Sequence, residues 1–99
     1  MNPRHAEAAE QFHQDNPHIY IALRDLAFKL LVAGHRRWGA KALWETLRYE
    51  FAISTDAHVR DYVLNNNYTA WYARQLMANE PELADFFEIR ERQPNPTEL

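Results

Sequence analysis

The 99-residue chain contains no cysteine, only two glycines, and no apolar run long enough to form a transmembrane helix. Without cysteine, neither a disulfide framework nor a thiolate zinc site can stabilise the fold, so hydrophobic packing has to do so. Two isolated glycines do not form a glycine-rich phosphate-binding loop. The N-terminal segment also lacks the apolar stretch of a signal peptide, and together these absences predict a cytoplasmic protein with no membrane partner.

Patterns typical of catalysis and of metal binding are missing as well. None of the five histidines has another histidine three or four residues away, the spacing that lets two imidazoles of one helix bind a metal ion. No nucleophile-elbow or metalloprotease motif occurs, and no carboxylates are grouped for acid–base chemistry. We therefore expect no metal, no cofactor and no enzymatic activity.

The chain does contain enough apolar material for one core. Hydrophobic residues make up 46% of the sequence and aromatic residues 13%, in a chain too short for two independent cores. We predict a single helical domain over residues 1–93 and a flexible C-terminal tail over residues 94–99. The net charge is −3, yet residues 35–79 carry six basic and four acidic groups, so the centre of the chain is its basic part.

Apolar residues recur at three- and four-residue spacing along most of the chain and predict a mainly α fold of three to five helices. Asn-Pro pairs provide two helix starts, Gly34 a helix end, and Thr69 a cap for the last helix. The expected helices cover residues 3–15, 17–33, 40–51 and 70–79. On the third helix, Lys41, Glu45 and Arg48 lie opposite the apolar stripe, where an ordinary solvated face is expected.

Two segments have the composition of short strands. Residues 59–64 are rich in β-branched and aromatic side chains, and residues 87–92 alternate between apolar and charged ones, so the two segments could pair. Pro81 can equally open a helical turn that reaches Phe87, which leaves strand and helix open for this region. With a small two-stranded β element, the fold would be similar to a winged helix-turn-helix, because a plain helix-turn-helix has a shorter connection between its helices.

The helix after Thr69 provides the most specific functional prediction. Its outward face would present tryptophan, arginine and glutamine after a run of three asparagines, and amide and guanidinium groups suit hydrogen bonding to base edges. Basic residues that precede this helix would contact phosphates. The candidate DNA-binding residues are Arg36, Arg37, Lys41, Arg60, Asn67, Thr69, Trp71, Arg74 and Gln75. The simpler alternative is that the asparagines only cap the helix and that Arg74 is only solvated.

Two stretches, WGAKALWETLRYE and LNNNYTAWYARQLMANEPELADFFEIR, resemble a group of small proteins encoded by bacteriophages and prophages, and cover about two fifths of the chain. The resemblance implies a winged-helix domain, a phage or prophage origin, and either DNA binding or modulation of a host component. The similar residues are mainly packing and capping residues, so the resemblance transfers no catalytic residue.

The leading hypothesis from the sequence is a transcriptional regulator that places residues 67–75 in the major groove of double-stranded DNA. We expect it to act as a homodimer, because a single module this acidic would bind DNA weakly. The rival hypothesis is an inhibitor or adaptor that binds a host protein through Trp38, Trp71 and the acidic residues 80–92, since tryptophan is enriched at protein interfaces. Trp71 could also pack against residues 83–89. A structural or assembly component is a further alternative, and would form large symmetric oligomers.

Overall fold

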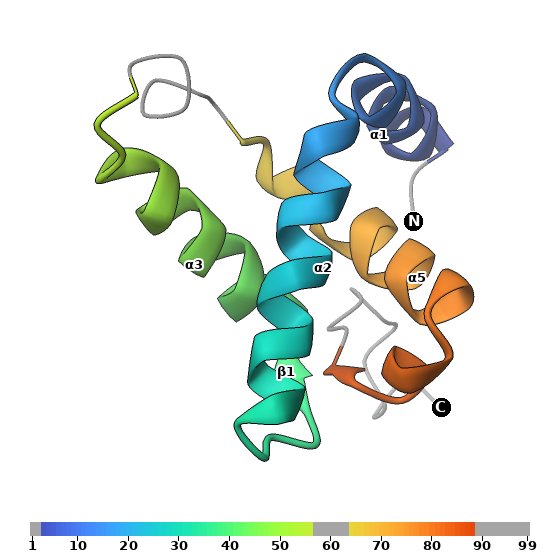
Figure 1. The fold of residues 1–99 in the computed structure, drawn as a ribbon. Coiled ribbons are helices and arrows are strands. Elements are labelled where there is room, and N and C mark those ends of the chain that lie inside the picture. Colours follow the sequence, from blue (N-terminus) through green and yellow to red (C-terminus); the bar gives the residue numbers. More distant parts are fainter. Residues whose placement is uncertain (1–2, 57–63, 89–99) are drawn as a thin grey trace, which may run out of the picture.

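The computed structural model describes residues 3–56 and 64–88, which form four α-helices, two short 3-10 turns and one two-stranded parallel sheet (Figure 1). The helices are α1 (Pro3–Asp15), α2 (Pro17–Val32), α3 (Ala40–Ala52) and α5 (Thr69–Asn79). The 3-10 turns are η1 (Asn66–Tyr68) and η2 (Pro81–Leu83), and the strands are β1 (Trp38–Gly39) and β2 (Phe87–Glu88). The predicted mainly α fold is confirmed, whereas a winged-helix topology stays a prediction. The predicted tail, residues 94–99, lies outside the described residues.

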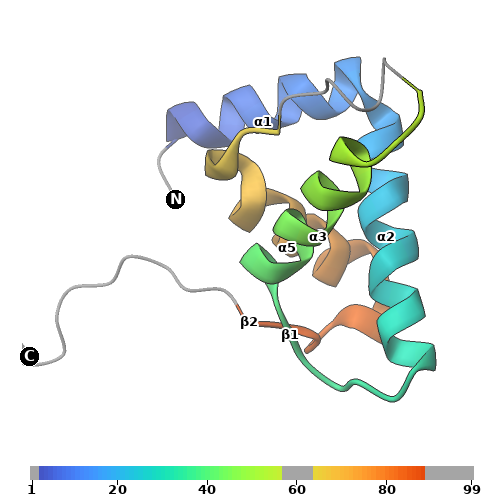
Figure 2. The same cartoon turned by 90° about the vertical axis from the view of Figure 1, so that its left-hand side faces the viewer.

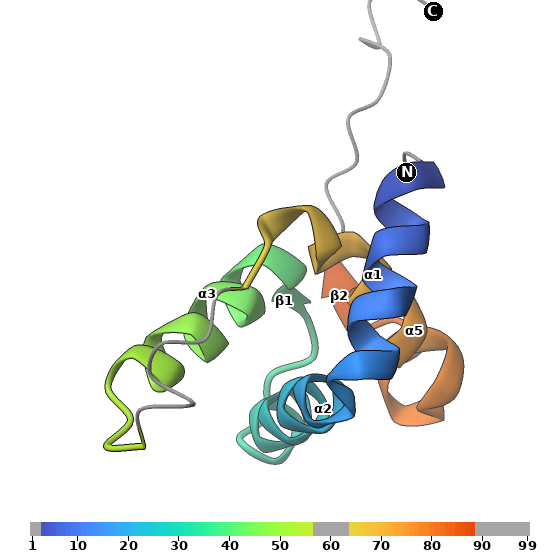
Figure 3. The ribbon, with the colours of Figure 1, turned by 90° about the horizontal axis from the view of Figure 1, so that it is seen from above.

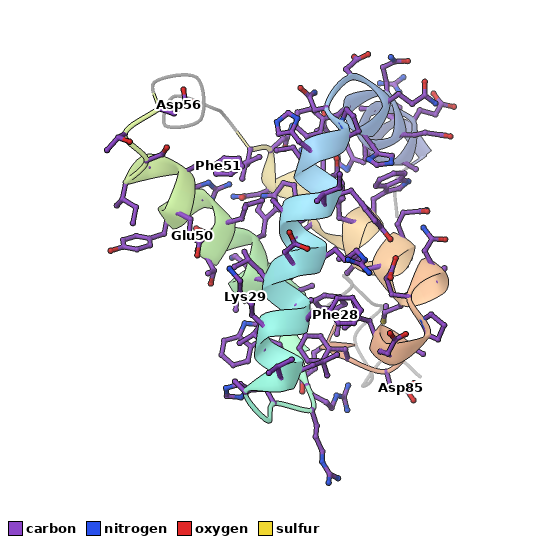
Figure 4. The ribbon with its side chains drawn as sticks, viewed as in Figure 1. Phe28, Lys29, Glu50, Phe51, Asp56 and Asp85 are labelled. Carbon is purple, nitrogen blue, oxygen red and sulfur yellow. The ribbon has the colours of Figure 1, made fainter. Side chains whose placement is uncertain are left out.

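Helix α2 is the central element and contacts α1, α3 and α5. Seen from above, α3 lies on one side of α2, and α1 and α5 lie on the other (Figure 3). Neighbouring residues of α2 therefore face different surroundings, with Lys29 beside α3 and Phe28 toward the C-terminal segments (Figure 4). No helix in the two described ranges combines the length and the hydropathy needed to cross a membrane.

Gly34 ends α2 for the reason that the sequence predicts. Its φ of 101° lies in the left-handed region that favours glycine. The Gly34 N–H donates to the Leu31 carbonyl and the His35 N–H to the Leu30 carbonyl, each at 3.0 Å. This is the hydrogen-bond pattern of a Schellman motif, and it turns the chain toward β1.

One core joins α2, α3, α5 and the C-terminal segments. Its largest fully buried side chains include Trp44 of α3 and Tyr72 of α5, whose ring centroids lie 5.4 Å apart. Residues that follow α5 return to this core, as their apolar character predicts. The buried members include Ile19, Leu23, Ala27, Leu43, Trp44, Leu47, Tyr72, Ala73, Leu76, Leu83, Phe86 and Phe87.

The described part of the chain contains a strand, β1, that the sequence does not predict. Strand β2 pairs in parallel with β1, with Trp38 opposite Phe87 and Gly39 opposite Glu88 (Figure 2). Leu64 is buried but not in a strand, and residues 59–63 and 89–92 lie outside the described ranges. A strand of two residues has no alternation that a sequence pattern could detect, so the partner of β2 was not predictable.

The segment after Pro81, for which the sequence leaves helix and strand open, contains both, first helical turns and then a short strand. Pro81 opens the 3-10 turn η2, a further turn follows over residues 84–86, and the chain is extended at Phe87 and Glu88. The Trp38 N–H donates to the Phe86 carbonyl at 2.9 Å and fixes the start of the pairing. This pairing brings the end of the described chain next to the start of α3.

Candidate nucleic-acid interface

A cleft with a volume of about 480 Å³ opens where the N-terminal ends of α3 and α5 meet. We refer to it as the α3–α5 cleft. The cleft is lined by residues around the starts of the two helices and by one residue of β2. These residues are Gly39, Ala40 and Lys41 at α3, Asn66 and Asn67 in η1, Thr69 and Ala70 in α5, and Glu88 in β2. Three of the nine predicted DNA-binding residues line the cleft, and the fold brings Lys41 together with Asn67 and Thr69, which are more than 20 residues away in the sequence.

The α3 side of the cleft is built by the exit from β1. Gly39 is the residue before α3 and has an extended backbone, with φ −69° and ψ 131°. As a glycine in the N-cap position, it provides no side chain to cap the helix. The first backbone N–H groups of a helix have no partner within the helix, and here the sheet pairing of Gly39 with Glu88 lies directly before them. Lys41 extends from the first turn into solvent, and within the described part of the chain it forms no ion pair.

The α5 side begins one turn earlier than the sequence predicts. Thr69 is not a cap, because its own backbone is already helical and its N–H donates to the Asn66 carbonyl. The capping side chain is that of Asn65, whose Oδ1 accepts a hydrogen bond of 2.9 Å from the Asn67 N–H. The turn η1 runs directly into α5, so Asn65, four residues before the first residue of α5, does the capping that the sequence assigned to threonine.

The three consecutive asparagines have different roles. Asn65 caps η1, and the Asn66 Oδ1 accepts a hydrogen bond from the Arg48 guanidinium. The carboxamide of Asn67 is exposed at the cleft and has no hydrogen-bond partner in the described ranges. The alternative that the run is only a capping loop therefore describes Asn65, but it does not account for Asn67.

Arg48 is a residue whose role the sequence did not indicate. It was expected on a solvated face, but its side chain is only 34% exposed. Its guanidinium pairs with Glu45 of the same helix, and it donates to the Leu64 carbonyl at 2.8 Å and to Asn66. Arg48 thereby holds the segment before α5 against α3. The partners lie 16 and 18 residues away, a separation at which helical periodicity gives no information.

Arg36 and Arg37 lie beside the α3–α5 cleft rather than in it. Both are exposed before β1 and line a second hollow of about 460 Å³, which also contacts Asp85 and Phe87. The Arg37 Nε lies 3.9 Å from the Glu88 Oε1, and both side chains are more than half exposed. Because Glu88 lines the first cleft, this pair reduces the negative charge at its wall. Arg60 lies outside the described residues.

The remaining candidates lie further along α5. Arg74 and Gln75 are half-buried, and Arg74 already has an interaction within the chain. Trp71 does not face outward as predicted, because it packs against α1, with its ring centroid 5.6 Å from that of His13. The Trp71 ring also packs edge-on against Tyr72, with ring centroids 5.0 Å apart, and packing of Trp71 against residues 83–89 stays a prediction.

Within residues 3–56 and 64–88, no group of three or more histidine, aspartate or glutamate side chains is placed to hold a metal ion. The side chains that line the α3–α5 cleft offer hydrogen bonding and charge: one ammonium, two carboxamides, a hydroxyl and one carboxylate. Searches of family models, of curated proteins and of solved structures found no match to this chain.

Proposed function

We propose that this protein binds double-stranded DNA through the α3–α5 cleft, as a small regulator of the helix-turn-helix kind. The observation that supports the proposal is that the N-terminal ends of α3 and α5 open onto the same cleft, together with Lys41 and Asn67. In helix-turn-helix proteins, the first helix of the pair crosses the phosphate backbone and the N-terminal residues of the second contact base edges. Here α3 would be the first helix and α5 the second.

The charged and the uncharged polar side chains of the cleft suit different parts of DNA. Lys41 suits a phosphate, and Arg36 and Arg37 extend the positive charge beyond the cleft. Asn67, in the turn that leads into α5, suits base edges. Since the whole chain has a net charge of −3, non-specific attraction to DNA is weak, and we propose that two copies bind two half-sites.

The test is selection of binding sequences from a randomised duplex pool, followed by fluorescence anisotropy on the enriched duplex at several salt concentrations. Affinity should fall steeply with salt, and Lys41→Ala should lower the slope of log K against log salt by about 1. Lys29→Ala is the matched control, because Lys29 is also an exposed lysine without a described ion pair and lies outside the cleft. A wild-type protein that binds no duplex even at low salt would rule the proposal out.

A second candidate function is binding to a host protein. The surface that favours this function is not the one that the sequence predicts. Trp38 and Trp71 are half-buried, and Trp38 packs edge-on against His35 with ring centroids 4.9 Å apart. Tyr49 of α3 and Ile53, which directly follows that helix, are instead 64% and 61% exposed. A host-protein complex that forms with wild type, is lost in Tyr49→Ser with Ile53→Ser, and persists in Lys41→Ala would support this function.

A further inference from the structure

We infer that Asn67 selects the base bound in the α3–α5 cleft and that this base is adenine. The inference rests on the proposed DNA binding and makes it more specific. It follows from comparing what each polar side chain of the cleft already contacts. Such a comparison separates side chains used by the fold from side chains available to a ligand, because a polar group with a satisfied hydrogen bond gains less from a new partner.

Of the two asparagines that line the cleft, only one is available. Asn66 accepts a hydrogen bond from Arg48, which also holds the Leu64 carbonyl, so rotating the Asn66 side chain toward a ligand would break a contact of the fold. Asn67 is exposed, and in the part of the chain that the structure describes its carboxamide forms no hydrogen bond. Both carboxamide groups of Asn67, the N–H donors and the carbonyl acceptor, are therefore available.

The backbone that presents Asn67 is held from both sides. Its own N–H donates to the Asn65 Oδ1 at 2.9 Å, and the neighbouring Tyr68 packs against Phe12 of α1 with ring centroids 5.3 Å apart. Only the asparagine side chain then remains to be ordered on binding. A group presented in this way loses little conformational freedom when it binds, which favours its use in recognition.

The chemistry of the carboxamide points to adenine. In the major groove adenine presents the N7 acceptor beside the N6 amino donor, and an asparagine side chain can bond to both at once. Guanine presents two acceptors in the same place, which suits arginine or lysine. Lys41 lies in the same cleft and forms no ion pair among the described residues, so it is the group available for the adjacent phosphate.

The experiment replaces each adenine of the enriched duplex in turn with 7-deazaadenine, which lacks the N7 acceptor but still pairs with thymine. At one position of each half-site the wild-type protein should lose on the order of tenfold in affinity. Asn67→Ala should lose about as much on the unmodified duplex and should not distinguish adenine from its analogue at that position. Gln14→Ala, which removes an exposed carboxamide from α1, should behave as wild type.

The outcomes separate this inference from the proposed function. If the wild type selects a sequence and binds it with a steep salt dependence, but Asn67→Ala still discriminates against 7-deazaadenine, DNA binding stands and the role of Asn67 is wrong. If Asn67→Ala loses affinity equally for all DNA sequences, the Asn67 side chain contacts the DNA backbone rather than a base, and the inference is again wrong. If the wild type binds no duplex, both fail. An unchanged melting temperature of Asn67→Ala would show that a loss is not due to unfolding.

Discussion

The two ends of α5 differ in how their polar groups are used. At the C-terminal end, the Glu80 carboxylate accepts a hydrogen bond of 2.9 Å from the Arg24 Nε and one of 3.2 Å from the Tyr20 hydroxyl. The guanidinium of Arg24 also lies 4.7 Å from the centre of the Phe28 ring. At the N-terminal end, Asn67 and Lys41 have no such partners in the described ranges.

This difference indicates what each end does. The side chain of Glu80 is only 18% exposed, and its hydrogen bonds tie the end of α5 to α2, so that end stabilises the fold. The exposed polar groups around Asn67 leave hydrogen-bonding capacity unused beside a cleft, so that end is available for binding. Substitutions at the C-terminal end should therefore change stability, and substitutions in the cleft should change affinity.

The largest effect on stability is expected for Glu80→Ala. It removes the acceptor shared by Arg24 and Tyr20, and we expect a loss of about 1–2 kcal/mol in the free energy of unfolding, since Arg24 is partly solvated. Urea denaturation followed by circular dichroism measures it. Glu82→Ala, at an exposed neighbouring position, should stay within about 0.5 kcal/mol of wild type. Equal losses in the two variants would contradict the role of Glu80.

Arg48→Ala should affect both stability and binding, because Arg48 supports the binding end of α5. Loss of its hydrogen bonds to Leu64 and Asn66 should lower the free energy of unfolding by about 1 kcal/mol. DNA affinity should fall as well, although Arg48 does not line the cleft, because η1 is no longer held against α3. Denaturation and anisotropy on the same preparation measure both quantities. An unchanged affinity would show that η1 is held by Asn65 and Tyr68 alone.

The pH dependence of stability should report on the C-terminal end. Burial raises the pKa of the Tyr20 hydroxyl above its ordinary value of 10.0, and the hydrogen bond to Glu80 raises this pKa further, while one to Asn79 lowers it. The folded state thus favours the protonated hydroxyl. This contribution to stability is complete below the pKa of the unfolded chain and is lost as the pH rises through the folded pKa. Tyr20→Phe should flatten the decline in melting temperature above pH 10, and an unaltered decline would contradict it.

The smallest effect on stability is expected for Glu88→Gln in the cleft. Glu88 and its partner Arg37 are more than half exposed, so the free energy of unfolding should change by less than about 0.5 kcal/mol. Removing a carboxylate from the cleft should nonetheless raise DNA affinity a few-fold at low salt, because phosphate is no longer repelled. Anisotropy at low and high salt would test this, and a lower affinity would show that Glu88 contacts a base instead.

Much of the helical framework was predictable from the sequence. The spacing of apolar residues and the Asn-Pro pairs predict α1 and α2, and Gly34 ends α2 where the chain requires a positive φ. Such features depend on residues within one or two turns of one another. The same local patterns placed Lys41 and Asn67 among the candidates for DNA binding, but they misplaced the cap of α5 and the exposure of Trp71.

The remaining features depend on pairs of residues far apart in the chain. The pairing of β1 with β2 joins Gly39 to Glu88, and the packing of Trp71 on His13 joins the first helix to the last. Neither contact has a periodic pattern, because the two-residue strands are too short and the aromatic contact is a single pair.

The sequence by itself determined which segments are helical and which part of the chain is basic, because helix propensity, capping and charge are properties of neighbouring residues. Only the tertiary structure decided which of three consecutive asparagines remains available. That depends on Arg48 reaching Asn66 across 18 residues. A polar side chain is satisfied by a donor or acceptor that the fold brings within about 3 Å, and packing rather than sequence order sets which group that is.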